Sequence, residues 1–204
     1  MSGDVAATVG GGCVTVADVD GRENALRAGR AAAALPRPGT SEGRQLRRWI
    51  TQVLVAEQVV AAAARALGVE DERAPAEADL LPDEVARLEI GSVAASTLSA
   101  PVGRAVFARV TAAVHVSDAD VRDYHRRNPL RFAPRPEGAD GWWGAPVGAE
   151  LDKVRAAVAA HLLAAARRRE YRRWLDARCA DAVVLAPGYE HPGDPRQPDN
   201  THRH

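Results

Sequence analysis

The residues best suited to chemistry gather at the C-terminal end of the chain. Residues 189–204 hold three of the six histidines, spaced by prolines and carboxylates. Imidazole and carboxylate groups suit zinc, copper, nickel or iron, and a terminal His-x-His can present two nitrogens to one ion. The same composition is typical of a solvated, disordered terminus, so the metal site and the disordered tail both stay open. The candidate metal ligands are His191, Asp194, Asp199, His202 and His204.

Three aromatic side chains are candidates for contact with a partner protein. Trp142 and Trp143 stand next to each other in a segment rich in glycine and proline, and Tyr189 opens the C-terminal arm. Tryptophan dominates binding hot spots, but large aromatic side chains are also often buried. The tryptophan pair therefore either anchors a partner or covers the core, and Tyr189 is expected to hold the root of the arm against the core.

The usual catalytic motifs are missing from the sequence. Ile90–Ala94 lacks the spacing and the second glycine of a nucleophile elbow. The triple glycine Gly10–Gly12 is not followed by a phosphate-binding pattern, so a tight turn is expected there. Cys13 and Cys179 form no CxxC pair, and we expect two reduced thiols. These motifs therefore give no support for an enzyme, and a metal-dependent enzyme that uses the C-terminal arm stays open as the alternative.

Charged and titratable residues on the predicted helices have a structural interpretation and a functional one. A run of arginines between residues 167 and 173 is either a phosphate-binding face or a solvated helix face balanced by the acidic linker 70–79, and we expect the solvated face. The histidines outside the tail are expected to be structural or exposed, because no nucleophile or carboxylate stands at motif spacing from them. The residues concerned are Arg167, Arg168, Arg169, Arg172, Arg173, His115, His125 and His161.

The overall composition is that of an ordinary soluble globular protein. Of 204 residues, 46% are hydrophobic and 26% charged, and the formal net charge is zero. Zero net charge argues against a dedicated binder of nucleic acid or of membrane surfaces. The first residues lack the basic and apolar regions of a secretory signal, and no apolar run approaches a membrane span of about 20 residues. We therefore expect a cytoplasmic protein, whose oligomeric state the sequence leaves open.

One long helix is predicted to be the scaffold for the other elements. Between Ser41 and Gly68, apolar residues recur with the three-and-four spacing of an amphipathic helix. Ser41 can cap the first turn, and Gly68 suits the left-handed residue that ends it. At about 1.5 Å per residue the helix is about 39 Å long, so it can contact every other element of a small domain.

Shorter elements are predicted on both sides of this helix. Val5–Val9 is expected to form a strand, followed by the glycine turn and a helix over about residues 16–34, which Thr15 caps with Asp18 at the third position. A short strand at residues 181–185 is expected to pair with the first one. Further helices are expected over residues 83–99, 102–113, 117–128 and 151–178. The expected buried side of the helix over 83–99 carries Val85, Leu88, Val93 and Leu98.

The order of these elements resembles the SurA/PrsA-type foldases, which are helical chaperones that carry a parvulin prolyl isomerase domain. VGGGCVTVADVD, at residues 9–20, is similar to the family's opening VNGxxITxxEVD. The long helix resembles the family's central LxxLIxxxLLxxxAxxxGV helix. VSDADVRDYHRRNPLRF, at 116–132, is similar to VTDEEVxxYYxxNPxxF, and residues 151–185 resemble the returning helix and strand. Only residues 133–150 stand where the parvulin domain would be, so no isomerase residue carries over.

The resemblance implies a mainly α fold, like the N-terminal domain of SurA, with a minor strand pair. We expect one helical domain over residues 1–185, with the loop 133–150 in place of the parvulin domain, and a Pro/His-rich arm over residues 186–204. The function it implies is that of a non-catalytic, chaperone-like or partner-binding protein, whose partner is a protein or peptide. The alternative is a metal-binding protein or metal-dependent enzyme that uses the C-terminal arm.

Overall fold

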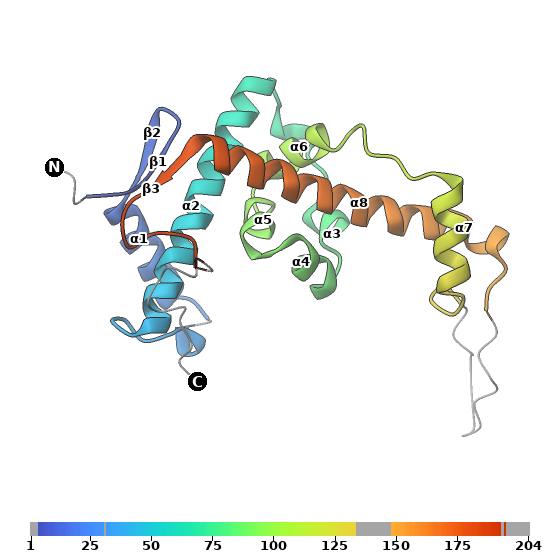
Figure 1. Ribbon diagram of the computed structural model, residues 1–204, viewed down its shortest axis with the longest axis horizontal. Helices are drawn as coiled ribbons and strands as arrows, with labels where there is room; N and C mark the ends of the chain where they lie inside the picture. The colour runs from blue at the N-terminus through green and yellow to red at the C-terminus, as the bar shows by residue number, and fades with distance from the viewer. Residues whose placement is uncertain (1–3, 31, 134–147, 193, 195–204) are drawn as a thin grey trace.

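A computed structural model of the chain describes residues 4–30, 32–133, 148–192 and 194. Within them the fold is mainly helical, with eight α-helices and one three-stranded antiparallel sheet (Figure 1). The helices are α1 (Val16–Arg27), α2 (Ser41–Leu67), α3 (Glu77–Leu80), α4 (Glu84–Ile90), α5 (Ser92–Thr97), α6 (Pro101–Val110), α7 (Asp118–Arg127) and α8 (Leu151–Ala182). The strands are β1 (Val5–Val9), β2 (Gly12–Thr15) and β3 (Val183–Leu185), and two short 3-10 turns are η1 (Ala32–Ala34) and η2 (Asp71–Arg73).

Helix α2 is the scaffold that the sequence predicts. α1, α5, α6, α8 and the sheet all contact it, and its side chains Ile50 and Val55 are almost fully buried. Its end at Gly68 is as predicted, because Gly68 adopts a left-handed conformation with φ of 59°. Its first turn is capped one residue earlier than expected: the Thr40 hydroxyl accepts a hydrogen bond from Gly43 N at 3.0 Å.

The apolar character of α2 is greater than the sequence analysis allowed. α2 is long enough and apolar enough to cross a membrane, with a mean hydropathy of 1.3 over its most apolar window. The expectation that no segment approaches that length was therefore wrong. Of that window, 44% is buried inside the protein. The core helix of a soluble protein can be equally long and apolar, so this finding is weak support for a membrane span.

The sheet joins the two ends of the helical domain. β1 lies in the middle and pairs with β2 and β3 in the order β2-β1-β3. Ala7 is opposite Leu185 and Val9 is opposite Val183, which confirms the predicted strand pair, although residues 181–182 belong to α8. The residues after the glycine turn, expected to lead directly into a helix, first form β2. The reason is that Val14 can be buried completely once the chain reverses at Gly10, whose φ is 56°.

Helix α1 begins as predicted but ends early. The hydroxyl of Thr15 accepts a hydrogen bond from Asp18 N at 3.1 Å, and the Asp18 carboxylate accepts one from Thr15 N at 2.8 Å. Together these two bonds form a capping box, and the bonds from Thr15 lower the pKa of Asp18. The helix ends at Arg27 rather than near Ala34.

The predicted helix over residues 83–99 is two helices with different buried faces. Gly91, with φ of 87°, separates α4 from α5 and turns the second helix away from the axis of the first. The expectation that Val85 and Leu88 are buried was wrong, since they are 60% and 73% exposed. Ala86 and Ile90 are buried instead. The pattern was read as one continuous helix, and the break at Gly91 changes which residues face the core.

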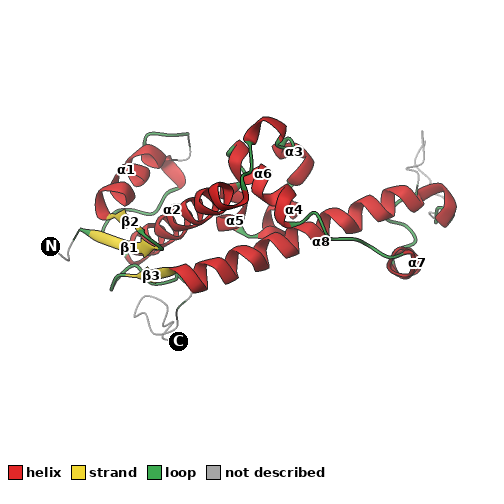
Figure 2. Ribbon diagram, turned by 90° about the horizontal axis from the view of Figure 1, so that it is seen from above, coloured by secondary structure: helices red, strands yellow, loops and turns green. Residues whose placement is uncertain are grey.

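Helix α8 carries the chain from a distal region back to the sheet. α7, which Ser117 caps as predicted, lies against α8 at the end opposite the sheet (Figures 1 and 2). The α8 helix has 32 residues, which corresponds to about 48 Å at 1.5 Å per residue. The protein is therefore elongated, with the sheet and α7 at its two ends.

Candidate functional site

A cavity of about 780 Å³ lies beside the tip of the β1–β2 hairpin. We call it the hairpin groove. Its walls are the hairpin tip Val9–Cys13, the outer face of α2 between Gln58 and Leu67, Val110 of α6, and Trp174, Arg178 and Ala182 of α8. Binding sites for small ligands usually have volumes of about 300–1,000 Å³, so the groove is large enough to hold one.

Two features of the sequence build the groove. The surface of α2 that faces the hairpin tip carries alanines at positions 61–63 and 66. Their methyl side chains project only a short distance from the helix, so they leave the space beside it open. The hairpin is held at both sides: Gln58 Nε2 donates to Cys13 O at 3.0 Å, and Gly10 N donates to Ala182 O at 2.9 Å. These hydrogen bonds fix the hairpin tip, and the small alanine side chains leave space between it and α2. The fold itself therefore maintains the groove.

The charge of the groove is positive. Arg65 and Arg178 are both exposed and line it, and no aspartate or glutamate is among its lining residues. Neither guanidinium group makes an ion pair with any carboxylate in the described part of the chain. A ligand that carries carboxylates would find two cations without competing partners.

An aromatic ring gives the groove part of its apolar wall. Trp174 is partly buried and stacks on Tyr171, with ring centroids 5.6 Å apart and an interplanar angle of 26°. Leu67, which is 42% exposed, lies on the same cavity. The groove therefore offers an aromatic ring and an exposed aliphatic side chain to an apolar group of a ligand.

The groove lacks the groups that catalysis would need. Cys13 is exposed there, but no histidine or carboxylate lines the groove to activate its thiol. Cys179 lies outside it, and burial raises the pKa of this thiol to about 11, so it stays protonated at neutral pH. Among the lining residues, the Cys13 thiol therefore has no side chain beside it that would activate it.

The arginine run of α8 is divided between the interior and the surface. Arg168 is only 5% exposed, and its Nη2 lies 2.8 Å from Glu89 Oε2 on α4. The expectation of a uniformly solvated face was therefore wrong at this position, because α4 packs across α8 there and supplies the carboxylate. Arg168 ties the two helices together.

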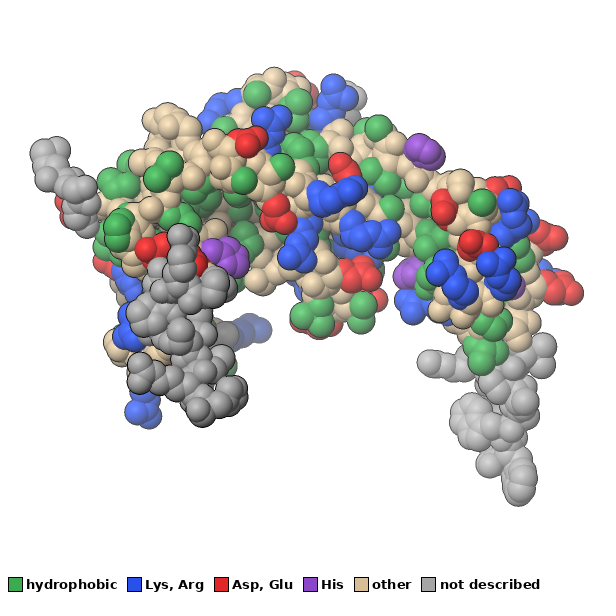
Figure 3. Space-filling model, in the orientation of Figure 1, with side chains coloured by type: hydrophobic (Ala, Val, Ile, Leu, Met, Phe, Trp, Pro, Cys, Tyr) green, Lys and Arg blue, Asp and Glu red, His purple; other side chains and the backbone are tan. Residues whose placement is uncertain are grey.

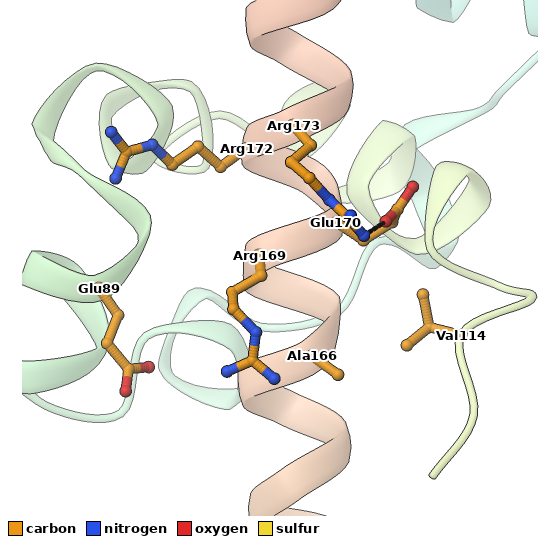
Figure 4. Close-up of a pocket in the computed structure, with 7 residues that line it drawn as sticks. All are labelled: Glu89, Val114, Ala166, Arg169, Glu170, Arg172 and Arg173. Atoms are coloured by element: carbon orange, nitrogen blue, oxygen red, sulfur yellow. Dashed lines mark hydrogen bonds and ion pairs between the residues drawn. The ribbon is translucent and has the colours of Figure 1, made fainter.

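Three other arginines of the run, Arg169, Arg172 and Arg173, line a second cavity of about 520 Å³. Figure 4 shows Arg169 and Arg172 on the side of α8 that faces Glu89, and Arg173 paired with Glu170. Basic and acidic side chains are mixed over the middle of α8 in Figure 3. Because Glu89 and Glu170 line the same cavity, it has no clear preference for an anion.

The histidines outside the tail serve in local structure. His161 Nε2 and Tyr124 OH lie 3.1 Å apart and Phe132 packs on both rings, so this cluster joins α7 to α8. Burial, followed by the nearby Arg131, lowers the pKa of His161. His125 Nε2 lies 2.7 Å from Ala149 O, and His115 Nδ1 lies 3.3 Å from Ala113 O.

The root of the C-terminal arm lies against the helical domain. Tyr189 is partly buried against the core and is hydrogen-bonded to Arg47 of α2. His191 lines a cavity of about 510 Å³ together with Cys179 and Asp176 of α8. Tyr189 thus holds the arm at its root, as expected, and its role in binding a partner stays a prediction.

Most of the predicted site residues lie outside the described part of the chain. These are Trp142, Trp143, Asp199, His202 and His204. Of the predicted metal ligands, only His191 and Asp194 are described. Within the described ranges, no group of three or more histidines, cysteines and carboxylates is placed to hold a metal ion.

Comparison with known proteins adds one short match. Residues 5–42 match the model of a family of unknown function, DUF7158. This match covers β1, β2, α1 and the start of α2, and so includes the hairpin that forms one wall of the groove. No curated protein and no solved structure matches the chain.

The hairpin groove was not predicted from the sequence. Two features of the sequence that contribute to it are the triple glycine at 10–12 and the alanines of α2 on the face that carries Arg65. Each has an ordinary structural explanation by itself, a tight turn in one case and helix propensity in the other. Only the contact between hairpin, α2 and α8 turns them into one surface.

Proposed function

We propose that this protein is a non-catalytic, chaperone-like protein that binds extended polypeptide segments of partner proteins. The hairpin groove is the observation that carries the proposal, since it combines exposed apolar side chains with cations that have no partner in the described chain. A site of this composition suits a polypeptide better than a reactive small molecule, because it lacks the groups that would perform chemistry.

The resemblance to the helical part of SurA/PrsA-type foldases supports the same function. The elements that carry the resemblance are the opening hairpin with α1, the long α2, the α7 segment and the returning α8 and β3. Their order in the chain is that of the family pattern. We propose the chaperone-like helical body of these foldases without their isomerase, since only residues 133–150 stand at the position of the parvulin domain.

The alternative function as a metal protein gains no support from the described residues. His191 lies near Cys179 and Asp176, but the other proposed ligands from the tail lie outside the described ranges. The metal interpretation therefore rests on the composition of the arm alone.

We propose the cytoplasm as the location of the protein. Both cysteines are free, and Cys13 is exposed. Exposed free thiols are typical of reducing compartments, where disulfides are rare.

The proposal is tested with the full chain and a chemically denatured client protein. Light scattering after dilution of the client should show less aggregation when this protein is present at equimolar amount. A proline-limited peptide assay should show no isomerase activity. Ala62→Trp, which fills the groove from an exposed position on α2, should weaken binding of the client by about tenfold or more, equivalent to about 1.4 kcal/mol.

The matched control is Ala157→Trp, at an exposed alanine of α8 outside the hairpin groove. It adds the same indole to a helix surface and should leave binding of the client unchanged. Aggregation that proceeds equally with and without the protein would contradict the proposal. Catalysis of proline isomerisation that scales with protein concentration would contradict its non-catalytic part.

A further inference from the structure

We propose that the hairpin groove selects extended segments in which aliphatic and acidic side chains alternate. The inference rests on the proposed binding of polypeptides and adds the chemical class of the segment. The charges, the apolar walls and the exposed hairpin backbone each support it.

The groove presents its two cations without acidic neighbours. Other arginines pair with carboxylates, such as Arg22 with Glu57 and Arg87 with Glu77, at 2.8 and 2.7 Å. Arg65 and Arg178 have no ion pair in the described chain, although the chain carries equal numbers of acidic and basic residues. Two unpaired guanidinium groups beside one cavity favour a ligand with carboxylates, because charge-assisted hydrogen bonds are stronger than neutral ones.

The apolar walls require aliphatic groups in the same ligand. The surface of α2 that lines the groove consists mostly of alanine methyl groups, with Leu67 at its end, and Trp174 of α8 lines the same cavity. In an extended chain, successive side chains point to opposite sides. A segment that alternates Val or Leu with Glu or Asp therefore turns its apolar side chains to the groove floor and its carboxylates to the open side, where the long arginine side chains can pair with them.

The position of the two cations favours a peptide over a fatty acid. Arg65 belongs to α2 and Arg178 to α8, so the positive charges come from two different walls. A fatty acid carries a single carboxylate, whereas a peptide can carry one for each arginine.

The hairpin tip also offers backbone groups to a peptide. Gly10, Gly11 and Gly12 are exposed on the groove, and a Cβ added at Gly11 would meet no atom within 4 Å. Gly11 has no positive φ, so neither its conformation nor its neighbours require a glycine. The absent side chain lets another backbone approach closely, which suits hydrogen bonds with an extended peptide.

The test measures binding of fluorescent peptides to the full-length protein by anisotropy. The probe is a short peptide that alternates Val and Glu, and its counterpart has Gln in place of Glu. The acidic peptide should bind at least about tenfold more tightly, a difference of about 1.4 kcal/mol, and salt should weaken its binding. Arg65→Gln and Arg178→Gln should each remove much of this difference. Arg169→Gln, an exposed arginine of α8 outside the groove, is the matched control and should remove none.

Each other outcome contradicts the inference in a recognisable way. Equal binding of the Glu and Gln peptides, still blocked by Ala62→Trp, overturns the acidic preference and leaves the proposed polypeptide binding intact. If dodecanoate binds and neither peptide does, the ligand of the groove is a fatty acid and the inferred peptide ligand is wrong. Binding of the acidic peptide that Arg65→Gln and Arg178→Gln do not change overturns the groove as its site. Failure of both peptides and of the denatured client removes the proposed function together with the inference.

Discussion

The hydroxyl of Tyr171 is a polar group within the core, and the side chain is fully buried. It lies 2.7 Å from Thr97 Oγ1, which itself donates to Ala94 O, so Tyr171 acts as the donor of this bond. Its ring lies 5.1 Å from that of Phe107. Burial raises the pKa of Tyr171 to about 12 from its ordinary value of 10.0. The core therefore depends on this hydroxyl remaining protonated.

Tyr171→Phe should change both stability and its dependence on pH. At pH 7 the lost hydrogen bond should cost about 1 kcal/mol. The folded pKa lies above the unfolded one, so the stabilisation by the neutral phenol is complete below pH 10 and is lost as pH rises towards 12. Urea unfolding at a series of pH values should show a smaller alkaline loss in the variant.

Two comparisons make this result specific. Some alkaline loss should remain in Tyr171→Phe, because burial also raises the pKa of Cys179 to about 11. Tyr124→Phe, which removes a tyrosine that is only partly buried, should keep the alkaline loss of the unmodified protein. An unchanged alkaline loss in Tyr171→Phe would show that this hydroxyl is not buried in the folded protein.

At the scale of elements, the pairing of β1 with β3 closes the domain. Gly10 N donates to Ala182 O and Ala186 N donates to Ala6 O, each at 2.9 Å, on either side of the paired residues. Hydrogen-bonded pairs alternate in antiparallel strands, so Thr8 and Val184 form such a pair, and the Val184 N–H points towards β1. The side chain of Val184 is 70% exposed and contributes little to the core.

Val184→Pro should destabilise the whole domain, because it removes one hydrogen bond from the middle of this pairing. The expected loss is about 1–3 kcal/mol in the free energy of unfolding. Thermal unfolding followed by circular dichroism should remain one cooperative transition at a lower temperature. Val184→Thr keeps the N–H and a β-branched side chain, and should leave the transition nearly unchanged. Equal melting of the two variants would mean that the strand pair does not support the domain.

At the scale of the whole molecule, the two ends of α8 have different surroundings. Near the sheet, α8 packs on α2, α5 and α6, whereas its first turns lie mainly against α7 (Figure 1). In the distal region Val121 and Val158 are buried, and the Tyr124–His161 pair adds a polar contact. Local stability follows the amount of packed apolar surface, so the distal region should open more easily than the centre.

Hydrogen exchange followed by mass spectrometry should reveal this difference. Amides of α7 and of residues 151–160 should exchange faster than those of α2, because they are packed by fewer elements. Phe132→Ala, which removes one ring of the distal cluster, should speed exchange in α7 and leave α2 unchanged. Equal protection of α7 and α2 would show that the molecule opens only as a unit.

The amino-acid sequence by itself determined the local features of the fold. The capping box of Thr15 and Asp18, the left-handed end of α2 at Gly68 and the Ser117 cap of α7 depend on residues within one turn of each other. The amphipathic period of α2 marked it as the scaffold, since its apolar stripe had to be covered. The strand pair was also predictable, because two short strands at the ends of one domain have few other partners.

The tertiary structure alone decided which surfaces meet. Arg168 is buried because Glu89 of α4 lies across α8, and Val85 and Leu88 are exposed because the chain breaks at Gly91. The hairpin groove combines residues 9–13, 58–67, 110 and 174–182, and no local pattern connects them. Burial and charge pairing depend on neighbours distant in the chain, so the positive, apolar character of this groove exists only in the folded protein.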